Sequence, residues 1–481
     1  MTSKLRKIYF LGIGGIAMAN LACLLKKKGY LVSGSDIDTF GPSAELLKTH
    51  KISYFKDHNP SHIKLFKPDI TVIGNAIQRG NPSLEYVLNN RLLYCSMPEI
   101  IKTQLLLNKK PIVITGTSGK TTTTALATWI LYKAGLKPTA LVGGIMKNLN
   151  SGFLNGNGEY VVLEGDEYNS SFYDSSPKFM HYLPYIGLIN NIQPDHLDIY
   201  GSIEEIIKAF RKLPRLIPEK GLLVMNANDK NSMSLKNDAK SKIETFGQGG
   251  SVMAKNIKTD SVGLDFNLYY KNKLLGKIKT KLLGKHNVEN ILAASAIALN
   301  VGISFKKIAE AMATFEGVKR RLEVIYDKNK IKIIDDFAHN PDKVLASLSA
   351  LRSHFPKHQI VAIFEPRTGS SRRKFFQNIY PPSFKPADLV YIAEPYKKSA
   401  LDKREVFSSR QLVSDLNKNS TEAYALATAD DIITHIKTNR LKTTASFRSF
   451  QRRRKTFPTI FCVMTSGGFD DIHQKLISLF K

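Results

Sequence analysis

Apolar runs of strand length alternate along most of the chain with segments of helical spacing. The first residues show this clearly. An apolar run at 5–11 predicts a strand, 12–15 predict a glycine-rich turn, and the apolar spacing of 16–28 predicts a helix. A second apolar run follows at 31–36, and together these segments predict a β-α-β unit. Because the pattern continues, residues 1–107 are predicted to form a small α/β domain.

Two further α/β segments follow. A strand that begins at Pro111 leads through a glycine-rich loop into a helix and opens a predicted domain over 108–321. Within it, the Val, Phe, Tyr and alternating Lys residues of 250–285 predict a short antiparallel insert. A third predicted domain, over 322–481, begins with a hairpin whose turn is expected near Lys328 and Asn329, and continues in alternating strands and helices. This alternation is typical of an α/β fold with mostly parallel sheets. The basic segment 440–455 is predicted to be a solvent-exposed loop or helix face.

The composition is that of a folded protein of about three domains, since the chain has 481 residues and a domain has ~150. With 43% hydrophobic and 23% charged residues, it is not a disordered chain, a collagen-like fibre or a small disulfide scaffold. No apolar stretch reaches the ~18 residues of a membrane-spanning helix, so we expect no membrane insertion. The first residues run directly into the predicted strand, so no export is expected. Cys23, Cys95 and Cys462 lack CxxC spacing, which favours the cytoplasm.

The net charge is unusual. The chain has 70 Lys+Arg against 41 Asp+Glu, a formal charge of +29. Nucleic-acid binding, anionic substrates and a lysine-rich composition each explain such a charge. A nucleic-acid binder is expected to show a recognition helix or basic residues interleaved with aromatic ones, and the sequence has no such module. We therefore expect no nucleic-acid partner.

The first glycine turn, Gly12–Ala17, fits the pattern G-x-G-x-x-G/A between a strand and a helix. Asp36 stands 24 residues after Gly12. Backbone N–H groups and a helix N-terminus at this place suit a diphosphate. A dinucleotide site, a nucleotide-sugar site and a tight turn without a ligand all remain open from this motif alone.

The second glycine turn, Gly116–Thr121, reads GTSGKT and also lies between a strand and a helix. Its glycines allow the backbone to wrap phosphates, Lys120 is able to reach β- and γ-phosphates, and the Thr121 hydroxyl is a ligand for Mg²⁺. Ile114 stands where the standard P-loop has glycine, so this loop is a shorter variant. A nicotinamide-dependent enzyme built on the first turn leaves this second loop unexplained.

Acidic and amide side chains follow later predicted strands. Glu164–Glu167 come directly after one apolar strand, and Asp195–Asp198, which include His196, follow another. Acids at the ends of parallel strands face the ligand crevice, where they serve as Mg²⁺ ligands or bases, although a helix N-terminus also attracts acids. Asn287 and Asn290 share a helix face and suit either a base edge or a helix cap.

Two arginine-containing segments complete the set of motifs. Arg320 and Arg321 lie at the predicted boundary into the third domain, where an arginine is able to meet a transferring phosphate. The arginines of 365–373 suit a carboxylate or a phosphate.

In this order, the motifs resemble those of the Mur ligase family over essentially the whole chain. The matching segments are GIGGIAM with SGSD, GTSGKTTTT, LEGDEYNSSF, NNIQPDHLD, GKHNVENILAA, GVKRRLE and DDFAHNP. The resemblance implies an α/β fold in which Rossmann-like N- and C-terminal domains flank a P-loop-type ATPase domain. It also implies a UDP-sugar site in 1–107, an ATP site in 108–321 and a site for the incoming amino acid or peptide in 322–481.

The resemblance implies a role for each matched residue. The implied catalytic residues are Lys120, Glu164, His196 and Arg321. The implied ATP site consists of Gly116, Thr117, Ser118, Gly119, Lys120, Thr121, Thr122, Asn287, Asn290, Arg321 and Asp336. The implied Mg²⁺ ligands are Thr121, Glu164 and His196. The implied substrate contacts are Gly12, Gly14, Gly15, Asp36, Asn75, Arg79, His339 and Arg367.

The implied reaction is an ATP-dependent amide ligation. ATP phosphorylates the carboxylate of UDP-N-acetylmuramate, and an amine then attacks the acyl phosphate. The segments 72–88, 176–184, 363–371 and 463–476 resemble those members that add the tripeptide L-alanyl-γ-D-glutamyl-meso-diaminopimelate in peptidoglycan recycling. The alternative acceptor is L-alanine, and the expected state is a monomer or weak dimer. Ser118 and Asn340 stand where the family commonly has histidine.

Overall fold

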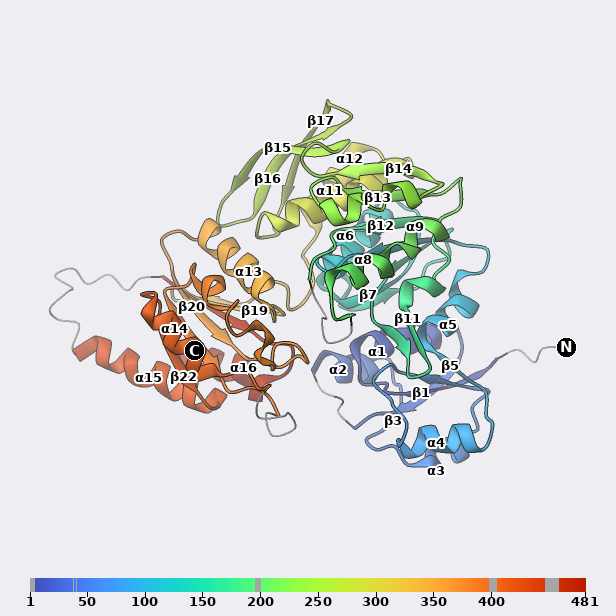
Figure 1. Ribbon diagram of the computed structural model, residues 1–481, viewed down its shortest axis with the longest axis horizontal. Helices are drawn as coiled ribbons and strands as arrows, with labels where there is room; N and C mark the ends of the chain where they lie inside the picture. The colour runs from blue at the N-terminus through green and yellow to red at the C-terminus, as the bar shows by residue number, and fades with distance from the viewer. Residues whose placement is uncertain (1–4, 38, 40, 195–199, 398–404, 446–457) are drawn as a thin grey trace. The chain divides into compact units, whose positions relative to one another are not determined.

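The computed structural model describes residues 5–37, 39, 41–194, 200–397, 405–445 and 458–481 (Figure 1). The chain forms two compact units. The first contains 1–257, 265–281 and 287–318, and the second contains 258–264, 282–286 and 319–481. Both consist of sheets with helices packed on them, which confirms the predicted α/β class. The predicted domain boundaries at 107 and 321 stay predictions.

The first sheet of unit 1 has five parallel strands in the order β3-β2-β1-β4-β5, which is the strand order of a Rossmann-type sheet. Its strands are β1 (Lys7–Leu11), β2 (Leu31–Ser35), β3 (Tyr54–Phe55), β4 (Ile70–Ile73) and β5 (Tyr94–Ser96). Its helices are α1 (Ile16–Lys27), α2 (Gly41–Thr49), α3 (Pro60–Phe66), α4 (Pro82–Asn89) and α5 (Met97–Ile101). Alternate residues of β1 pack with α1 and α2 on one face and with α3 and α4 on the other.

The second sheet of unit 1 has ten strands in the order β17-β16-β15-β14-β13-β12-β6-β9-β7-β8. Its strands are β6 (Lys110–Thr115), β7 (Thr139–Met146), β8 (Ser151–Leu154), β9 (Tyr160–Glu164), β12 (Ile186–Ile189), β13 (Leu222–Asn226), β14 (Lys242–Phe246), β15 (Val252–Thr259), β16 (Leu264–Tyr270) and β17 (Lys273–Thr280). Strand β6 pairs in parallel with β12 on one side and β9 on the other. The chain order thus reverses at β6, and ligands of open α/β sheets bind beyond the carboxyl ends of strands at such a point.

Several helices and a small second sheet accompany these ten strands. The helices are α6 (Lys120–Lys133), α8 (Ile203–Phe210), α9 (Lys212–Leu216), α10 (Lys230–Met233), α11 (His286–Asn300) and α12 (Phe305–Thr314). The antiparallel strands β10 (Asn169–Ser171) and β11 (Asp174–Pro177) are followed by a 3₁₀ turn at Lys178–His181. Helix α6 is buried along most of its length, which suits a helix that begins in the phosphate loop and packs inside the domain.

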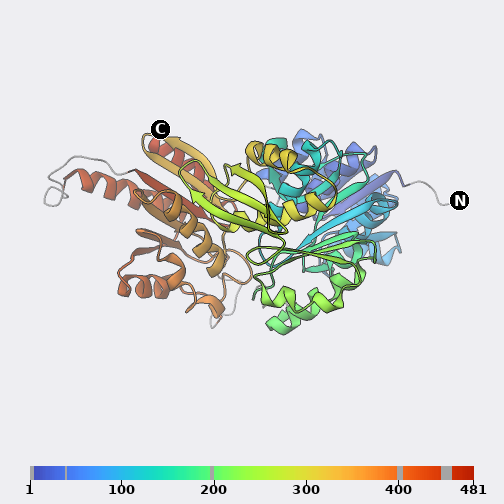
Figure 2. The same ribbon diagram turned by 90° about the horizontal axis from the view of Figure 1, so that it is seen from above.

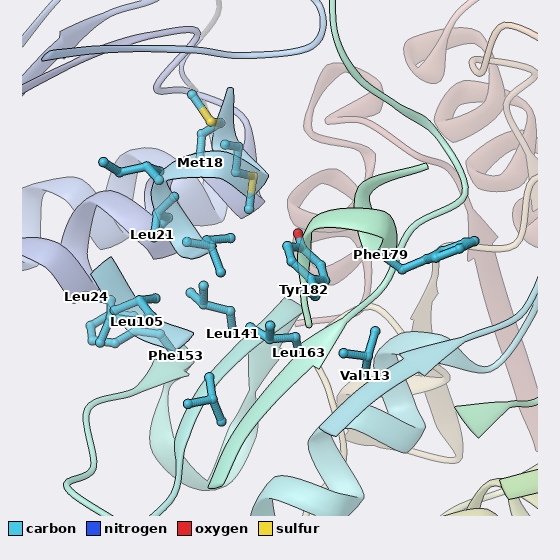
Figure 3. Packing of buried hydrophobic residues seen from close by; sticks show 14 of the residues in the cluster. Met18, Leu21, Leu24, Leu105, Val113, Leu141, Phe153, Leu163, Phe179 and Tyr182 are labelled. Atoms are coloured by element: carbon cyan, nitrogen blue, oxygen red, sulfur yellow. The ribbon is translucent and has the colours of Figure 1, made fainter. Parts of the chain in front are cut away.

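The two sheets of unit 1 share one hydrophobic cluster, which Figure 3 shows from close by. Met18 and Leu21 of α1 belong to it together with Leu141 of β7 and Leu163 of β9. In addition, the Asn20 side chain donates a hydrogen bond to the carbonyl of Val142 at 3.3 Å. This packing brings the helix after the first glycine turn next to the strands that lead to Glu164.

Unit 2 is built on a six-stranded sheet in the order β18-β19-β23-β20-β21-β22. Its strands and helices are drawn in orange to red in Figures 1 and 2. Its strands are β18 (Glu323–Lys328), β19 (Ile331–Asp336), β20 (Gln359–Phe364), β21 (Leu389–Ala393), β22 (Glu422–Leu426) and β23 (Thr459–Met464). Helices α13 (Pro341–His354) and α14 (Ser409–Lys418) pack on one face, and α15 (Ala429–Ala445) and α16 (Ile472–Phe480) pack on the other.

The predicted hairpin at the start of the third segment is present as β18 and β19, which pair antiparallel. The basic segment predicted at 440–455 begins within α15, and 446–457 lie outside the described residues. Among the residues that the structure describes, no helix is both long and apolar enough to span a membrane.

Candidate active site

The first glycine turn follows β1 and leads into α1. Gly12 has φ +84°, a backbone conformation that side chains other than glycine rarely adopt. The backbone N–H of Gly14 donates to Asp36 Oδ2 at 2.8 Å, and Gly15 precedes the first turn of α1. The structure thus brings together four predicted residues of the sugar-nucleotide site. In this arrangement the Asp36 carboxylate holds the turn itself through a backbone N–H group.

Asn75 and Arg79 lie on the exposed segment between β4 and α4. The Arg79 guanidinium forms two hydrogen bonds with the Glu85 carboxylate, at 2.9 and 3.0 Å. The same carboxylate accepts the N–H of Gly80 at 2.7 Å. Arg79 therefore stabilises the start of α4 in the structure, and its predicted contact with a nucleotide sugar stays a prediction.

The phosphate loop lies between β6 and α6 and needs glycine at two positions. Gly116 has φ +130° and Gly119 has φ +81°. A Cβ atom at Gly119 would lie within 3 Å of both Asn290 Oδ1 and Asn190 Nδ2, and a Cβ at Gly116 would lie 2.9 Å from the Asn190 Cβ. Both the backbone conformation and the close packing thus exclude larger residues from the loop.

Asn191, which follows β12, holds the other side of the loop. Its side-chain Oδ1 accepts hydrogen bonds from the Thr117 hydroxyl at 2.8 Å and from the Ser118 N–H at 2.9 Å. Its carbonyl accepts the Thr117 N–H at 3.0 Å. The end of the neighbouring strand thereby preorganises the loop. Asn191 binds Ser118 through its backbone N–H. This contact does not depend on the Ser118 side chain, which stands where the family commonly has histidine.

Lys120 begins α6, and its ammonium is almost enclosed. It donates to the Gly116 carbonyl at 2.6 Å and to Glu167 Oε2 at 2.8 Å. Burial by itself lowers the pKa of this ammonium, but the carboxylates of Glu167 and Asp166 outweigh that effect and raise the pKa. Lys120 is therefore a permanently charged donor at the mouth of the loop, which is what a phosphate-binding lysine requires.

Thr121 and Glu164 form the second pair of the site. The Thr121 hydroxyl donates to Glu164 Oε1 at 2.9 Å, and the N–H of Gly143 donates to Oε2 at 2.7 Å. Burial, and then the nearby Asp166 charge, raise the pKa of the Glu164 carboxyl, while Lys120 opposes them. The cost of burying this carboxylate is relieved by a cation, so the raised pKa and the all-oxygen pair fit Mg²⁺.

The third predicted metal ligand, His196, lies outside the described residues. Within the described part of the chain, no group of three or more His, Cys, Asp and Glu side chains is arranged to hold a metal ion. The oxygen atoms of Thr121 and Glu164 suit Mg²⁺, which keeps several waters and binds through one or two carboxylates together with phosphate oxygens.

The predicted adenine-binding residues Asn287 and Asn290 lie on α11, and both are buried. Asn290 Nδ2 donates to Asn287 Oδ1 at 2.9 Å, and its Oδ1 accepts the Thr123 hydroxyl at 3.1 Å. Asn290 thus supports the start of α6 through Thr123. Thr122, the neighbouring predicted ATP contact, is also buried. The predicted contact of this pair with a base stays a prediction.

Arg321 and Asp336 lie in unit 2. The buried Asp336 carboxylate accepts the N–H groups of Leu322 at 2.7 Å and Ala338 at 2.8 Å, and the Ser347 hydroxyl at 3.0 Å. Its pKa is raised by burial, although these donors and the Arg321 charge oppose the shift. Asp336 therefore shapes the loop after β19, and the Arg321 guanidinium lies 5.1 Å from the centre of the Phe337 ring.

His339 and Arg367 also follow strands of unit 2. His339 is buried, with Nδ1 2.9 Å from the Phe337 carbonyl. The Arg367 guanidinium stacks 3.6 Å above the centre of the Tyr396 ring and forms an ion pair with Glu365 at 3.1 Å. Arg367 is thus held in one orientation at the end of β20, as a preorganised carboxylate-binding arginine would be.

Several polar residues of the site were not singled out from the sequence. Glu167, Asn190 and Asn191 lie within the motifs that follow β9 and β12, so their motifs are the signal that identifies them. Lys178 and Tyr182 lie in the segment 176–184, which resembles that of the tripeptide-adding members, but neither residue was given a role from the sequence. Both line a cavity that reaches Glu164, and only the fold brings them there.

The site combines a glycine-rich phosphate loop, at the switch point of a parallel sheet, with a buried lysine and an acid at a strand end. These features define an enzyme that binds a nucleoside triphosphate. Three family models match the chain: the Mur ligase family catalytic domain over 7–107, the Mur ligase middle domain over 114–298, and the glutamate ligase domain of Mur ligases over 320–437. The chain belongs to the Mur ligase family, as the motifs predicted, and is an ATP-dependent ligase that forms a C–N bond with ADP and phosphate as products.

Two relatives name different acceptors. The UDP-N-acetylmuramate–L-alanine ligase of Clostridium acetobutylicum is 36% identical over 90% of this chain and 92% of its own. The UDP-N-acetylmuramate–L-alanyl-γ-D-glutamyl-meso-2,6-diaminoheptandioate ligase of Haemophilus influenzae is 32% identical over 99% of this chain and 100% of its own. Among solved structures, the murein peptide ligase of Psychrobacter arcticus is 28% identical with a TM-score of 0.73, covering 98% of both chains.

Proposed function

We propose that the chain joins the tripeptide L-alanyl-γ-D-glutamyl-meso-diaminopimelate to UDP-N-acetylmuramate in peptidoglycan recycling. One observation carries this choice of acceptor. The similarity to the Haemophilus influenzae enzyme extends over 99% of this chain and 100% of that one, whereas the similarity to the L-alanine ligase covers 90% and 92%. In this proposal, residues 1–107 bind the UDP-sugar, 108–321 bind ATP, and 322–481 bind the peptide.

The chemistry follows from the weakness of a carboxylate as an acylating agent. The muramoyl carboxylate oxygen attacks the γ-phosphorus of ATP, the bond from this phosphorus to the β–γ bridging oxygen breaks, and an acyl phosphate and ADP result. The peptide α-amine then attacks its carbonyl carbon, the C–O bond to phosphate breaks as the C–N bond forms, and the amine loses a proton. In the first step, the Lys120 ammonium neutralises negative charge on the phosphoryl group that is being transferred. Mg²⁺, held by Thr121 and Glu164, would neutralise phosphate oxygens.

The second candidate is L-alanine as the acceptor, with the same chemistry. The 36% identity to the Clostridium acetobutylicum enzyme favours it, since this exceeds the 32% identity to the tripeptide ligase. The two candidates share the ATP site and differ in what unit 2 must accommodate: one small amino acid, or a peptide with several carboxylates.

Phosphate release with each acceptor distinguishes the two candidates. The purified chain is supplied with UDP-N-acetylmuramate, ATP and Mg²⁺, and phosphate release is followed with the tripeptide or with L-alanine, the products being identified by mass spectrometry. We expect kcat/KM for the tripeptide to exceed that for L-alanine by at least about a hundredfold, which corresponds to about 2.7 kcal/mol. Faster turnover with L-alanine would replace the proposal with the second candidate.

We also propose a cytoplasmic location and a monomer or weak dimer. Cys23, Cys95 and Cys462 are buried free thiols, which suits a reducing compartment. Sedimentation equilibrium of the purified chain tests the oligomeric state.

A further inference from the structure

A cavity in unit 1 lies between the helix that follows the first glycine turn and the strand end that carries Glu164. Ala17 and Asn20 of α1 line one side, and Glu164 and Lys178 line the other. Ala17 is the last residue of the glycine-turn motif, and Glu164 pairs with the first threonine of α6. The cavity therefore connects the predicted sugar-nucleotide turn with the predicted Mg²⁺ ligand.

The Lys178 ammonium is buried in the wall of this cavity with most of its hydrogen-bonding capacity unused. Its side chain is 10% exposed. Within the described residues it donates one hydrogen bond, to Asp166 Oδ2 at 2.8 Å. An ammonium has three donors, and a buried donor without a partner costs free energy. Lys178 thus retains donors for a ligand oxygen, and Asp166 holds it in position.

Two further groups add polar atoms to a lining that is otherwise largely apolar. Asn20 is fully buried, and its Oδ1 has no hydrogen-bond partner among the described residues. Tyr182, whose ring Figure 3 shows in the same region, also lines the cavity. A ligand that fills this space must therefore offer an acceptor to Lys178 and a donor to Asn20.

We propose that Lys178 binds the carboxylate of the nucleotide-sugar substrate, the group that becomes phosphorylated. This inference rests on the proposed function, because it takes UDP-N-acetylmuramate as the substrate. That molecule carries its carboxylate next to an acetamido N–H, which supplies both the acceptor and the donor. With Glu164 and Asp166 also at the cavity, a singly charged carboxylate is repelled less than a phosphate group with two charges. Lys178 is therefore a substrate-binding residue distinct from Lys120.

The test compares two nucleotide sugars that differ in the carboxylate. UDP-N-acetylglucosamine has the same nucleotide, sugar and acetamido group but lacks the lactyl group of UDP-N-acetylmuramate. Isothermal titration gives Kd for both ligands, and for ATP with Mg²⁺, with wild type, Lys178→Met and Lys178→Arg. Lys212→Met, at an exposed lysine of the same unit, is the matched control.

We expect Lys178→Met to weaken UDP-N-acetylmuramate binding by at least about tenfold, the effect of losing a charge-assisted hydrogen bond. Kd for UDP-N-acetylglucosamine should change less than about twofold, which also shows that the variant is folded. Lys178→Arg should recover part of the loss, and Lys212→Met should behave as wild type.

Three results would overturn the inference. Equal weakening of both sugars would make Lys178 a structural support of the cavity. Weaker ATP binding with unchanged sugar binding would place a phosphate there. Wild-type preference for UDP-N-acetylmuramate retained in Lys178→Met would show that another group binds the carboxylate. If wild type itself does not bind UDP-N-acetylmuramate, the proposed function fails, and this inference fails with it.

Discussion

Lys120 is the residue on which the chemical step is predicted to depend most. Its ammonium lies at the loop beside Glu167 and keeps its charge because the carboxylates around it raise its pKa. Lys120→Met should lower kcat for phosphate release by at least about a thousandfold, since charge neutralisation dominates phosphoryl transfer. Kd for UDP-N-acetylmuramate should stay within about twofold, measured by titration.

Lys133→Met is the control for that substitution. Lys133 is the last residue of the same helix and is exposed. The control should keep wild-type turnover. If Lys120→Met also releases phosphate at a near-normal rate, the phosphate loop has been assigned wrongly.

The buried carboxyl of Glu164 should make the stability of the fold depend on pH. Burial and the charge of Asp166 raise its pKa in the folded chain. A carboxyl of this kind stabilises the fold while protonated, and this contribution is lost as the pH rises through the folded pKa. Glu164→Gln cannot ionise. Without nucleotide and Mg²⁺, its melting temperature relative to wild type should rise by about 2–4 °C between about pH 5 and about pH 8.

Glu85, whose side chain is partly exposed, offers the opposite case. Its pKa is lowered by hydrogen bonds from Arg79 and from the N–H of Gly80. A carboxyl with a lowered pKa stabilises the fold at pH values above its pKa in the unfolded chain. Glu85→Gln should therefore not gain stability relative to wild type as the pH rises. If the two variants show the same slope, the raised pKa of Glu164 is refuted.

The polar residues of the site show what the sequence can and cannot predict. Glu164 stands at the end of one apolar strand, and Lys120 follows another after the loop 116–119, so their places at one sheet edge were predictable. The sequence does not show which polar groups are used within the protein. Asp336 accepts three hydrogen bonds from its own domain, and Asn290 supports the phosphate loop. Such uses depend on contacts between residues far apart in the chain, as does the pairing of Lys120 with Glu167.

Secondary-structure elements were easier to predict than single contacts, because each follows from the local spacing of apolar residues. The helix predicted over 16–28 is α1, Ile16–Lys27, and the strand predicted over 5–11 is β1, Lys7–Leu11. The turn of the hairpin in unit 2 was expected near Lys328 and Asn329. It consists of Asn329 and Lys330, both with positive φ. One residue of error is expected where several polar residues suit the same turn.

Helix α6 has a glycine at each end, and the two glycines allow a matched test of the phosphate loop. Gly119 has φ +81° and Gly135 has φ +85°, so alanine strains the backbone at both. A Cβ at Gly135 meets no atom within 4 Å, whereas one at Gly119 lies within 3 Å of Asn290 and Asn190. Gly119→Ala should weaken ATP binding by at least about tenfold and destabilise the fold by about 2 kcal/mol more than Gly135→Ala.

Titration with ATP and urea unfolding measure these two quantities. Gly135→Ala should bind ATP like wild type, because it changes only the C-terminal end of α6. If both variants bind ATP alike, the packing of Asn190 and Asn290 against the loop does not control the site.

The charge of the whole molecule, +29, is far larger than the site requires. The proposed substrates are anions, but the lysines proposed to contact them lie at the loop and in the cavity beside Glu164. At physiological salt, exposed charges are screened beyond ~8 Å. The excess therefore reflects composition rather than substrate binding, and the contrast between local and overall charge is testable.

Four exposed lysines on and beside β17 provide that test. They are Lys271, Lys273, Lys279 and Lys281. Strand β17 lies six strands from β6 in the same sheet, about 29 Å at ~4.8 Å per strand. Replacing all four with glutamine lowers the formal charge by four from +29, and should change kcat/KM for UDP-N-acetylmuramate by less than about twofold at 150 mM salt. Lys178→Met removes a single charge and should cost at least about tenfold. A tenfold loss in the fourfold variant, measured in the same assay, would instead show that the overall field of the molecule draws in its substrates.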